Sequence, residues 1–238
     1  MSQTFIFDFD QTISVIPAIQ HAFFASVNYK VEKMEAISQI IKNAQARYGN
    51  VAILDKIIAE ISLEIGRNLH ISDYHRAAEE ILKSGLTDGI AEVMGKIDKS
   101  GAQILVIGGG GTTCAILSEV LVNIGISPQN VYSGRTLLDK NGDILLGEVG
   151  FVNCFNGERI SQTWSKAEAV NNLRKIGKIS GRVIMIGDGE NDLEVKTSGN
   201  CDIFIGFGLH KFNLSVKNGC DKYAESPDEF FEIIDKYL

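Results

Sequence analysis

Residues 5–12 read FIFDFDQT, an apolar run that ends in two acids one residue apart. A short apolar run bounded by charge is typical of a buried strand. Asp8 and Asp10 would then follow the end of that strand, where both carboxylates can face one pocket. Like charges this close repel each other, so both stay ionised only if a cation or a lysine neutralises them. Taken alone, the pattern also fits a solvated acidic turn in which Thr12 caps a helix.

A second polar cluster follows another apolar run, because residues 182–192 read RVIMIGDGEND. Asp188 lies just past the end of this expected strand and could complete a site begun by Asp8 if the two strands are neighbours. Mg²⁺ prefers a few carboxylate oxygens together with water and substrate phosphate. The alternative is a glycine-rich turn in which Asp192 caps a helix.

The remaining pattern alternates between strands and helices. From about residue 14 to residue 97 the apolar spacing is helical, with Ser72 as a fitting N-cap within it. Residues 103–107 read as a strand before four glycines, and DKNG at 139–142 predicts a β-hairpin. Ser165, with Glu168 three residues later, predicts the start of another helix. Strands that alternate with helices favour an α/β fold with a parallel sheet covered on both faces, and ligands bind beyond the carboxyl ends of such strands.

Two further features have a possible link to phosphate. Lys166 falls in the first turn of a predicted helix, where the helix dipole disfavours a cation, so it either holds phosphate or is an ordinary surface lysine. The glycine run at 108–111 precedes a helix, and bare backbone amides at such a place can cradle phosphate. A flexible loop is an equally good interpretation of the glycines.

Composition excludes several classes of protein. The 238 residues carry 30 acidic and 23 basic side chains, a formal charge of −7, which argues against a nucleic-acid binder. No apolar run approaches the roughly 18 residues of a membrane span, and residues 1–4 lack the basic region of a signal peptide. The four cysteines lie too far apart in the sequence for a zinc knuckle or a redox pair. We therefore expect a reduced, cytoplasmic protein.

The four clusters, in this order, resemble the motifs of the haloacid-dehalogenase-like phosphohydrolases, in their phosphoserine-phosphatase-like subgroup. Residues 7–12 resemble the first motif, residues 107–110 the second, Lys166 the third and residues 187–192 the fourth. The resemblance implies a Rossmann-like sheet with a helical cap inserted after the first strand and a β-hairpin in the core domain. It implies a core of residues 1–13 plus 88–238 and a cap of residues 14–87.

The resemblance also implies roles for individual residues. Asp8 would attack phosphorus and form an aspartyl-phosphate, while Asp10 would act as general acid and then as general base. Mg²⁺ would be held by the Asp8 carboxylate, the Asp10 main-chain carbonyl and Asp188. The phosphate-binding set would be Gly108, Gly109, Lys166 and Asn191. Thr12 would fix the loop, and Asn191 and Asp192 would orient phosphate or Mg²⁺-bound water.

Two positions depart from the family pattern. Gly108 stands where the second motif normally has Ser or Thr, so one hydroxyl that would bind phosphate is missing. About where phosphoserine phosphatases carry a cap glutamate for the substrate amine, this chain has Pro17 in an apolar stretch. Phosphoserine is therefore an improbable substrate.

The sequence favours a Mg²⁺-dependent phosphatase that acts on a small-molecule phosphate monoester. One alternative is a phosphotransferase or phosphomutase on the same scaffold. Another is a catalytically weak member that acts as a binding or regulatory module, which Gly108 alone favours. Arg47, Arg67, His70, His75 and Arg76 are candidate substrate contacts in the helical segment, although each also fits an ordinary surface role. The sequence leaves the ester and the oligomeric state open.

Overall fold

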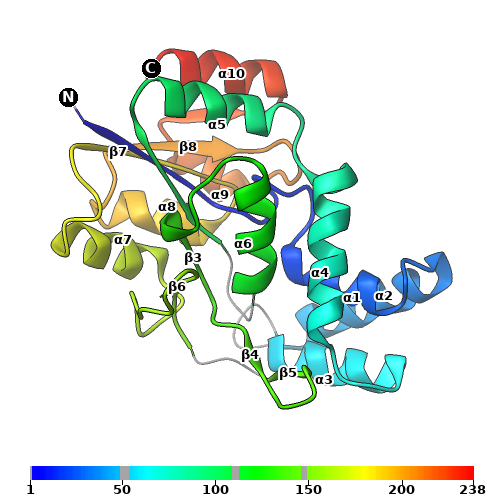
Figure 1. Cartoon of the computed structure of the whole chain (residues 1–238). Helices are drawn as coiled ribbons and strands as arrows, with labels where there is room; N and C mark the ends of the chain where they lie inside the picture. Colours follow the sequence, from blue (N-terminus) through cyan, green and yellow to red (C-terminus); the bar gives the residue numbers. More distant parts are fainter. Residues whose placement is uncertain (1, 49–53, 109–112, 146–148) are drawn as a thin grey trace.

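A seven-stranded sheet forms the centre of the molecule in the computed structural model, which describes residues 2–48, 54–108, 113–145 and 149–238 (Figure 1). The strand order is β6-β3-β2-β1-β7-β8-β9. The strands are β1 Gln3–Phe7, β2 Gln103–Ile107, β3 Val131–Ser133, β6 Val152–Asn153, β7 Arg182–Gly187, β8 Ile203–Phe207 and β9 Lys222–Ala224. Only β6 among them runs antiparallel to its neighbour.

Strand β1 lies in the middle of the sheet, between β2 and β7. Phe7 is in register with Val106 of β2 and with Ile186 of β7, so the three strands end at the same edge. The polar clusters that follow these strands in the sequence are therefore brought together at their carboxyl ends, as expected for an open parallel sheet.

Helices cover both faces of the sheet because alternate residues of each strand point to opposite faces. Phe5 and Phe7 face one apolar cluster, which they share with α5, α6 and α10. Ile6 faces the other cluster, which it shares with α7, α8 and α9. The bounds of these helices are α5 Ile90–Lys99, α6 Cys114–Asn123, α7 Lys166–Lys175, α8 Glu190–Thr197, α9 Leu214–Gly219 and α10 Pro227–Asp235; η2 is a 3₁₀ turn at Pro128–Asn130.

The chain between β1 and α5 is mainly helical, and its described residues contribute no strand to the seven-stranded sheet. In Figure 1 its helices, coloured blue to cyan, lie to one side of the sheet. They are α1 Ala18–Ser26, α2 Val31–Tyr48, α3 Leu54–Ile65, α4 Ile71–Glu80 and the π-helical turn η1 Ile81–Gly85. The expected N-cap at Ser72 is wrong, because α4 begins earlier and His70 is its N-cap.

A β-hairpin links the helical segment between β1 and α5 to the rest of the chain. Strands β4 Leu137–Leu138 and β5 Ile144–Leu145 pair antiparallel, which confirms the hairpin predicted from DKNG. Ile71 N donates to Gly142 O (2.9 Å), and Ile144 N donates to Leu69 O (2.8 Å). The hairpin therefore bonds to the backbone at the start of α4.

The expected α/β class, with a Rossmann-like sheet covered by helices and a β-hairpin, is confirmed. The expectation that no cysteines pair is wrong for two of the four. Cys114 and Cys154, separated by 40 residues, form a disulfide with their Cα atoms 5.2 Å apart. Sequence spacing could not predict this pair, because folding places α6 beside the end of β6. Among the described helices, none combines the length and the apolar character that a membrane span requires.

Candidate active site

Asp8 stands at the end of the central strand. Its backbone N–H donates to Ile186 O of β7 (2.8 Å), which extends the sheet ladder by one residue. The residue is 5 % exposed, and its Oδ1 accepts a hydrogen bond from Phe9 N (2.7 Å). The carboxylate is therefore held in a fixed position by its own loop at the middle of the sheet edge.

Asp192 is placed by a glycine at the end of β7. Its Oδ2 accepts from Gly189 N (3.0 Å) at the start of α8. A Cβ on Gly187 would lie 2.3 Å from Asp192 Cγ, so only glycine leaves room for this carboxylate against the strand end. The alternative interpretation, in which Asp192 caps a helix, also holds, because Asp192 accepts from the backbone of the N-cap residue Gly189. The same geometry turns its other oxygen toward Lys166.

Lys166 connects the two carboxylates. Ser165 caps α7 by accepting from Glu168 N (3.2 Å), as expected, and Lys166 is the first residue of that helix. Its Nζ lies 2.6 Å from Asp8 Oδ1 and 2.5 Å from Asp192 Oδ1. The side chain is only 3 % exposed, so the interpretation of Lys166 as a surface lysine is wrong.

The site carries more negative than positive charge. Burial and the neighbouring Asp192 raise the pKa of Asp8 well above its usual value, against the opposing attraction of Lys166. Burial and Asp192 likewise raise the pKa of Asp188 to about 6. Burial alone would lower the pKa of Lys166, but Asp192 and Asp8 reverse this and raise it. One ammonium is shared among several buried carboxylates, so a further cation would stabilise their ionised forms.

The carboxylates are close enough to share such a cation. Asp8, Asp188 and Asp192 each offer a ligand atom within 4.8 Å of the others, and all three are buried. Hard oxygen ligands with surplus negative charge fit Mg²⁺. The Asp10 carboxylate is not in this group, because its Oδ1 accepts from Ala18 N at the start of α1 (2.8 Å).

Three of the remaining expected residues make contacts that the structure describes, or are buried within it. Gly108 N donates to Tyr132 O (2.9 Å), whereas Gly109 lies outside the described residues. Asn191 accepts from Lys166 N (3.3 Å) and donates to Trp164 O (2.9 Å), so it joins the starts of α7 and α8. Thr12 is fully buried, and its hydroxyl has no hydrogen-bond partner within the described residues.

Sequence reasoning missed His210 and Lys211, which contact residues of the site or its neighbours. Thr87 Oγ1 donates to Thr12 O (2.7 Å) and lies 2.7 Å from His210 Nε2. Lys211 Nζ lies 4.0 Å from Asp188 Oδ2. His210 and Lys211 follow the end of β8, so the rule that polar residues at strand ends line a site would have singled them out.

The charged candidates of the helical segment are engaged with other protein groups. Arg67 and Arg76 both bind Asp73, and His75 Nδ1 lies 2.8 Å from Glu119 Oε2 of α6. His70 Nδ1 accepts from Ser72 N (3.1 Å), while Arg47 lies 3.6 Å from Glu60. These contacts give each residue a structural role.

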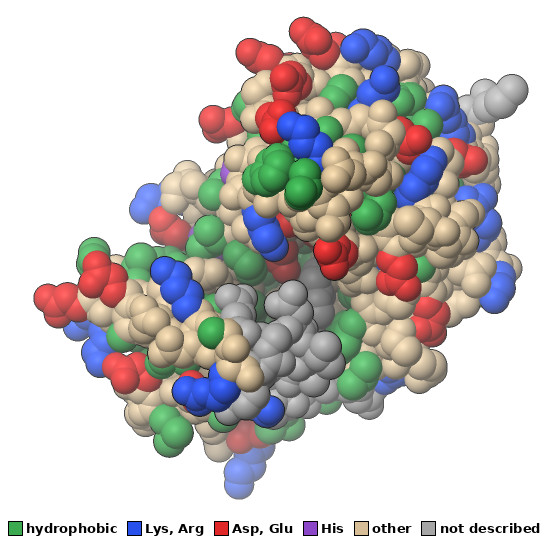
Figure 2. Space-filling model, turned by 180° about the vertical axis from the view of Figure 1, so that it is seen from behind, with side chains coloured by type: hydrophobic (Ala, Val, Ile, Leu, Met, Phe, Trp, Pro, Cys, Tyr) green, Lys and Arg blue, Asp and Glu red, His purple; other side chains and the backbone are tan. Residues whose placement is uncertain are grey.

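Acidic and basic side chains lie beside each other near the centre of the face opposite the view of Figure 1, as Figure 2 shows.

No family model matches the chain. The chain is 28 % identical over 216 residues to the chloroplastic phosphoserine phosphatase of Arabidopsis thaliana, an alignment that covers 90 % of this chain and 66 % of that protein. It is 29 % identical over 154 residues to the rat (Rattus norvegicus) phosphoserine phosphatase, covering 63 % and 60 %. The chain thus spans less than two thirds of the length of these curated relatives.

Solved structures share the fold. A phosphoserine phosphohydrolase-like protein from Francisella tularensis superposes with a TM-score of 0.73 at 23 % identity, covering 98 % of this chain and 100 % of that one. A structure described as a phospho-aspartyl intermediate analogue of phosphoserine phosphatase superposes with a TM-score of 0.66 at 20 % identity, covering 100 % and 99 %.

Proposed function

Because the chain belongs to the haloacid-dehalogenase-like hydrolases, in their phosphoserine-phosphatase-like subgroup, we propose that it is a Mg²⁺-dependent phosphatase of small-molecule phosphate monoesters. The observation that carries the proposal is the buried contact of Asp8 with Lys166 (2.6 Å) in a cluster of surplus carboxylates. A phosphoryl group transferred to Asp8 and a divalent cation are the two partners that such a cluster suits.

Asp8 is the nucleophile in this proposal. Both hydrogen-bonding partners that the described residues give it, Phe9 N and Lys166 Nζ, lie at Oδ1. Oδ2 is therefore the oxygen that attacks phosphorus and forms the aspartyl-phosphate. The solved structure described as a phospho-aspartyl intermediate analogue of phosphoserine phosphatase supports this chemistry by analogy of fold.

Asp10 carries the proton. Burial raises its pKa, although the hydrogen bond from Ala18 N opposes that shift. Because Ala18 N occupies Oδ1, we assign the proton to Oδ2, which would protonate the leaving oxygen and later accept a proton from the hydrolytic water.

The binding groups complete the assignment. Lys166 holds Asp8 and places one positive charge beside the transferred phosphate. Asp8 and Asp188, with the Asp10 carbonyl, would hold Mg²⁺, and Asp192 stands close enough to hold one of its waters. When bound, Mg²⁺ supplies charge neutralisation for phosphate and nucleophile. Of the two glycines expected to bind phosphate, Gly109 would donate its backbone amide, whereas the Gly108 amide is already bonded to Tyr132 O. Asn191 would keep Lys166 in place. Thr12 would hold the loop through its backbone.

Residues 14–87 would form a cap over a core of residues 1–13 and 88–238. Support comes from the contact of Asp10 with Ala18 at the start of α1 and from the hairpin bonded to the start of α4. A cap placed at the Asp10 side of the site would select the leaving group.

The substrate proposed is an ester without an amine next to the phosphate. Pro17 is the N-cap of α1 and makes no side-chain hydrogen bond there, at the position where the family's phosphoserine enzymes carry a glutamate. No carboxylate at that position is present to pair with an ammonium group.

A matched pair of esters tests the function and the substrate class together. Phosphate release from phosphoserine would be compared with release from 3-phosphooxypropanoate, the same ester without the amine, with and without MgCl₂. We expect Mg²⁺-dependent release and at least equal kcat/KM for the ester without the amine. A tenfold preference for phosphoserine would overturn the substrate class, and absence of release from a broad panel would overturn the function.

An added alcohol separates hydrolysis from transfer. If phosphate appears on glycerol instead of in solution, the protein is a phosphotransferase and the hydrolase proposal is wrong. A cytoplasmic location also stays a proposal, because the plant relative is named chloroplastic. Subcellular fractionation of the source cells would test it.

A further inference from the structure

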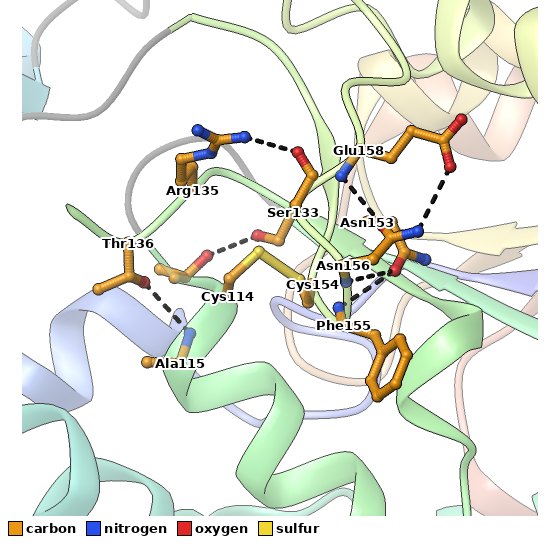
Figure 3. The surroundings of a disulfide bond; sticks show 12 residues. Cys114, Ala115, Ser133, Arg135, Thr136, Asn153, Cys154, Phe155, Asn156 and Glu158 are labelled. Atoms are coloured by element: carbon orange, nitrogen blue, oxygen red, sulfur yellow. Dashed lines mark hydrogen bonds between the residues drawn. A yellow bond between two sulfur atoms is a disulfide. The ribbon is translucent and has the colours of Figure 1, made fainter.

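The disulfide joins two segments that lie next to the proposed site. Cys114 is the first residue of α6, the helix that follows the glycine run, and Cys154 directly follows the edge strand β6. Figure 3 shows the S–S bond between the first turn of this helix and the turn at residues 153–158. The bond closes a segment that contains the β4-β5 hairpin.

The disulfide is accessible from the surface. Cys114 and Cys154 both line a pocket of about 430 Å³, together with Ser118, Arg135 and Thr136. Cys114 is 7 % exposed, whereas Cys154 is half-buried, so Cys154 presents the more accessible sulfur. A thiol that enters this pocket reaches Cys154 first.

The surroundings of Cys114 favour its thiolate. A helix N-terminus carries partial positive charge, which stabilises negative charge that develops on a sulfur in its first turn. Arg135 lines the same pocket and donates to Gly157 O (2.6 Å), which adds a cation nearby. The Cys114 sulfur is therefore the better leaving group of the two.

The other two cysteines have the opposite character. Cys201 is 7 % exposed, and burial raises the pKa of its thiol to about 12. Burial also raises the pKa of Cys220. Thiol chemistry in the native protein is therefore concentrated at the Cys114–Cys154 pair.

We propose that Cys114–Cys154 is a reversible redox-modification site, opened in the folded protein by a dithiol reductant. One reductant thiolate attacks Cys154 Sγ, the S–S bond breaks, and its electron pair leaves on Cys114 Sγ. The second reductant thiolate attacks the mixed disulfide and releases Cys154, and the reductant becomes a disulfide. The protein gains two electrons and two protons, and exchange with an oxidised dithiol closes the bond again. Disulfides in reducing compartments are usually transient or redox-sensing.

Opening the bond would loosen one region without unfolding the chain. Thr113 Oγ1 keeps its contact with Ser133 Oγ (2.7 Å), and Ala115 N keeps its bond to Thr136 Oγ1 (3.2 Å), as Figure 3 shows for Ala115 and Thr136. The first turn of α6 then depends on these contacts, on the hydrogen bond from Cys114 N to Gly134 O (3.1 Å) and on the burial of Ile116 and Leu117. Helix α6 also contacts α4, through the ion pair of Glu119 with His75. Loosening the first turn of α6 would therefore affect a helix that lies between the glycine run of the second motif and the helical segment.

Thiol counting in the folded protein tests the proposal directly. The full chain would be incubated with dithiothreitol without denaturant, alkylated, and weighed intact and as peptides. We expect both Cys114 and Cys154 to be alkylated within minutes and Cys201 to react only after denaturation. Oxidised dithiothreitol should restore the bond. Reduction that requires denaturant, or a pair that stays as free thiols in oxidised dithiothreitol, would overturn the proposal.

A monothiol tests the direction of attack. With glutathione followed by alkylation, we expect the mixed disulfide at Cys154 and the alkyl group at Cys114. Glutathione on Cys114 would contradict the assigned leaving group. These readouts involve no substrate, so they stand or fall separately from the phosphatase proposal.

Hydrogen exchange tests the structural consequence. We expect amides in the first turn of α6 to exchange at least tenfold faster after reduction, while those of α10 do not change. The double variant Cys114→Ser/Cys154→Ser should match the reduced protein, and Cys201→Ser should behave like wild type. Equal exchange in the oxidised and reduced states would contradict the loosening of α6.

Discussion

Two buried aspartates, Asp8 at the sheet edge and Asp73 in α4, show how differently the chain treats the same side chain. Asp73 is fully buried and accepts from Arg67 at 2.7 and 2.8 Å, while Arg76 and the His70 backbone bind it as well. Burial opposes ionisation, but these donors hold the pKa of Asp73 below its usual value. Asp8 shares one ammonium with Asp192, and burial raises its pKa.

The difference separates a structural charge cluster from a functional one. Around Asp73, two guanidinium groups balance one carboxylate, so the cluster is complete within the chain. Around Asp8, carboxylates outnumber the cation, so the cluster is completed only by a ligand with positive charge. Perturbed carboxylates with surplus charge are typical of functional sites. Substitutions in the two clusters should therefore affect different properties.

The largest expected effect is on turnover at Asp8. Asp8→Asn should lower kcat at least about 10³-fold, or about 4 kcal/mol in activation free energy, because an amide is a poor nucleophile. The melting temperature should not fall, since the change removes surplus negative charge. Steady-state phosphate release measures the effect, with Asp98→Asn on the exposed surface of α5 as the matched control. A variant that keeps more than a tenth of wild-type kcat would exclude Asp8 as the nucleophile.

Asp73→Asn should show the reverse pattern. Neutralising Asp73 leaves Arg67 and Arg76 without their carboxylate. Breaking a buried ion pair lowers the free energy of unfolding by about 3–5 kcal/mol. Because both arginines are about 40 % exposed, we expect a loss at the low end of this range, about 3 kcal/mol. The value of kcat should change less than threefold. Urea unfolding and phosphate release measure the two properties, with exposed Glu79→Gln as control. Loss of turnover without loss of stability would break the distinction between the clusters.

A buried histidine gives the helical segment a pH-dependent stability. His21 is 6 % exposed, neither ring nitrogen has a partner among the described residues, and burial lowers its pKa from 6.5 to about 4. Since the folded-state pKa is the lower one, the unfolded chain binds the proton more readily. Stability is therefore full above pH 6.5 and is lost as the pH falls toward 4. The expected loss between pH 7 and pH 5 is about 2 kcal/mol.

The variant His21→Phe isolates this contribution. Urea unfolding at pH 7 and pH 5 gives the loss of unfolding free energy on acidification for wild type and for the variant. Subtracting one loss from the other removes the contribution of all other titrating groups. The variant should lose about 2 kcal/mol less than wild type on acidification. Equal losses in the two proteins would show that His21 is protonated in the folded state.

The smallest expected effect concerns Gly108. A Cβ there would lie 2.2 Å from Leu117 Cδ2 and 3.0 Å from Phe9 Cβ, and Leu117 is fully buried. Gly108→Ser should therefore crowd α6 and lower kcat/KM three- to tenfold, or about 0.7 to 1.4 kcal/mol. Gly95→Ser, where nothing lies within 4 Å of the new atom, is the control and should leave kcat/KM unchanged. A tenfold rise with Gly108→Ser would show that the enzyme lacks a hydroxyl.

The core could be predicted from the sequence because its signals are local. The apolar runs before Asp8 and Asp188 mark strands, and parallel strands necessarily gather their carboxyl ends at one edge. Asp8, Asp188 and Asp192 are therefore identifiable from the sequence alone. Lys166 follows no strand, so the sequence leaves it open between a phosphate contact and a surface lysine. The cap at Ser165 also followed from local chemistry.

Other features depend on contacts between distant segments. The hydrogen bonds of α4 with the hairpin, the balance around Asp73 and the Cys114–Cys154 bond join residues that no short pattern relates. The expected cap at Ser72 failed because His70 Nδ1, not a serine oxygen, accepts from Ser72 N. His210 and Lys211 lie just past the end of β8, where the same strand-end pattern also predicts a site.

Trapping phosphate on the protein tests the central claim most directly. The chain would be mixed with ³²P-labelled p-nitrophenyl phosphate and MgCl₂ and quenched in acid within milliseconds. One aliquot would be counted before and after hydroxylamine, and a second would be reduced with borohydride, which converts an aspartyl-phosphate to homoserine and releases its phosphate. We expect protein-bound label that hydroxylamine releases, homoserine at position 8, and neither in Asp8→Asn. Turnover that continues with no label on the chain, or with label on another residue, would contradict the assignment of Asp8 as the nucleophile.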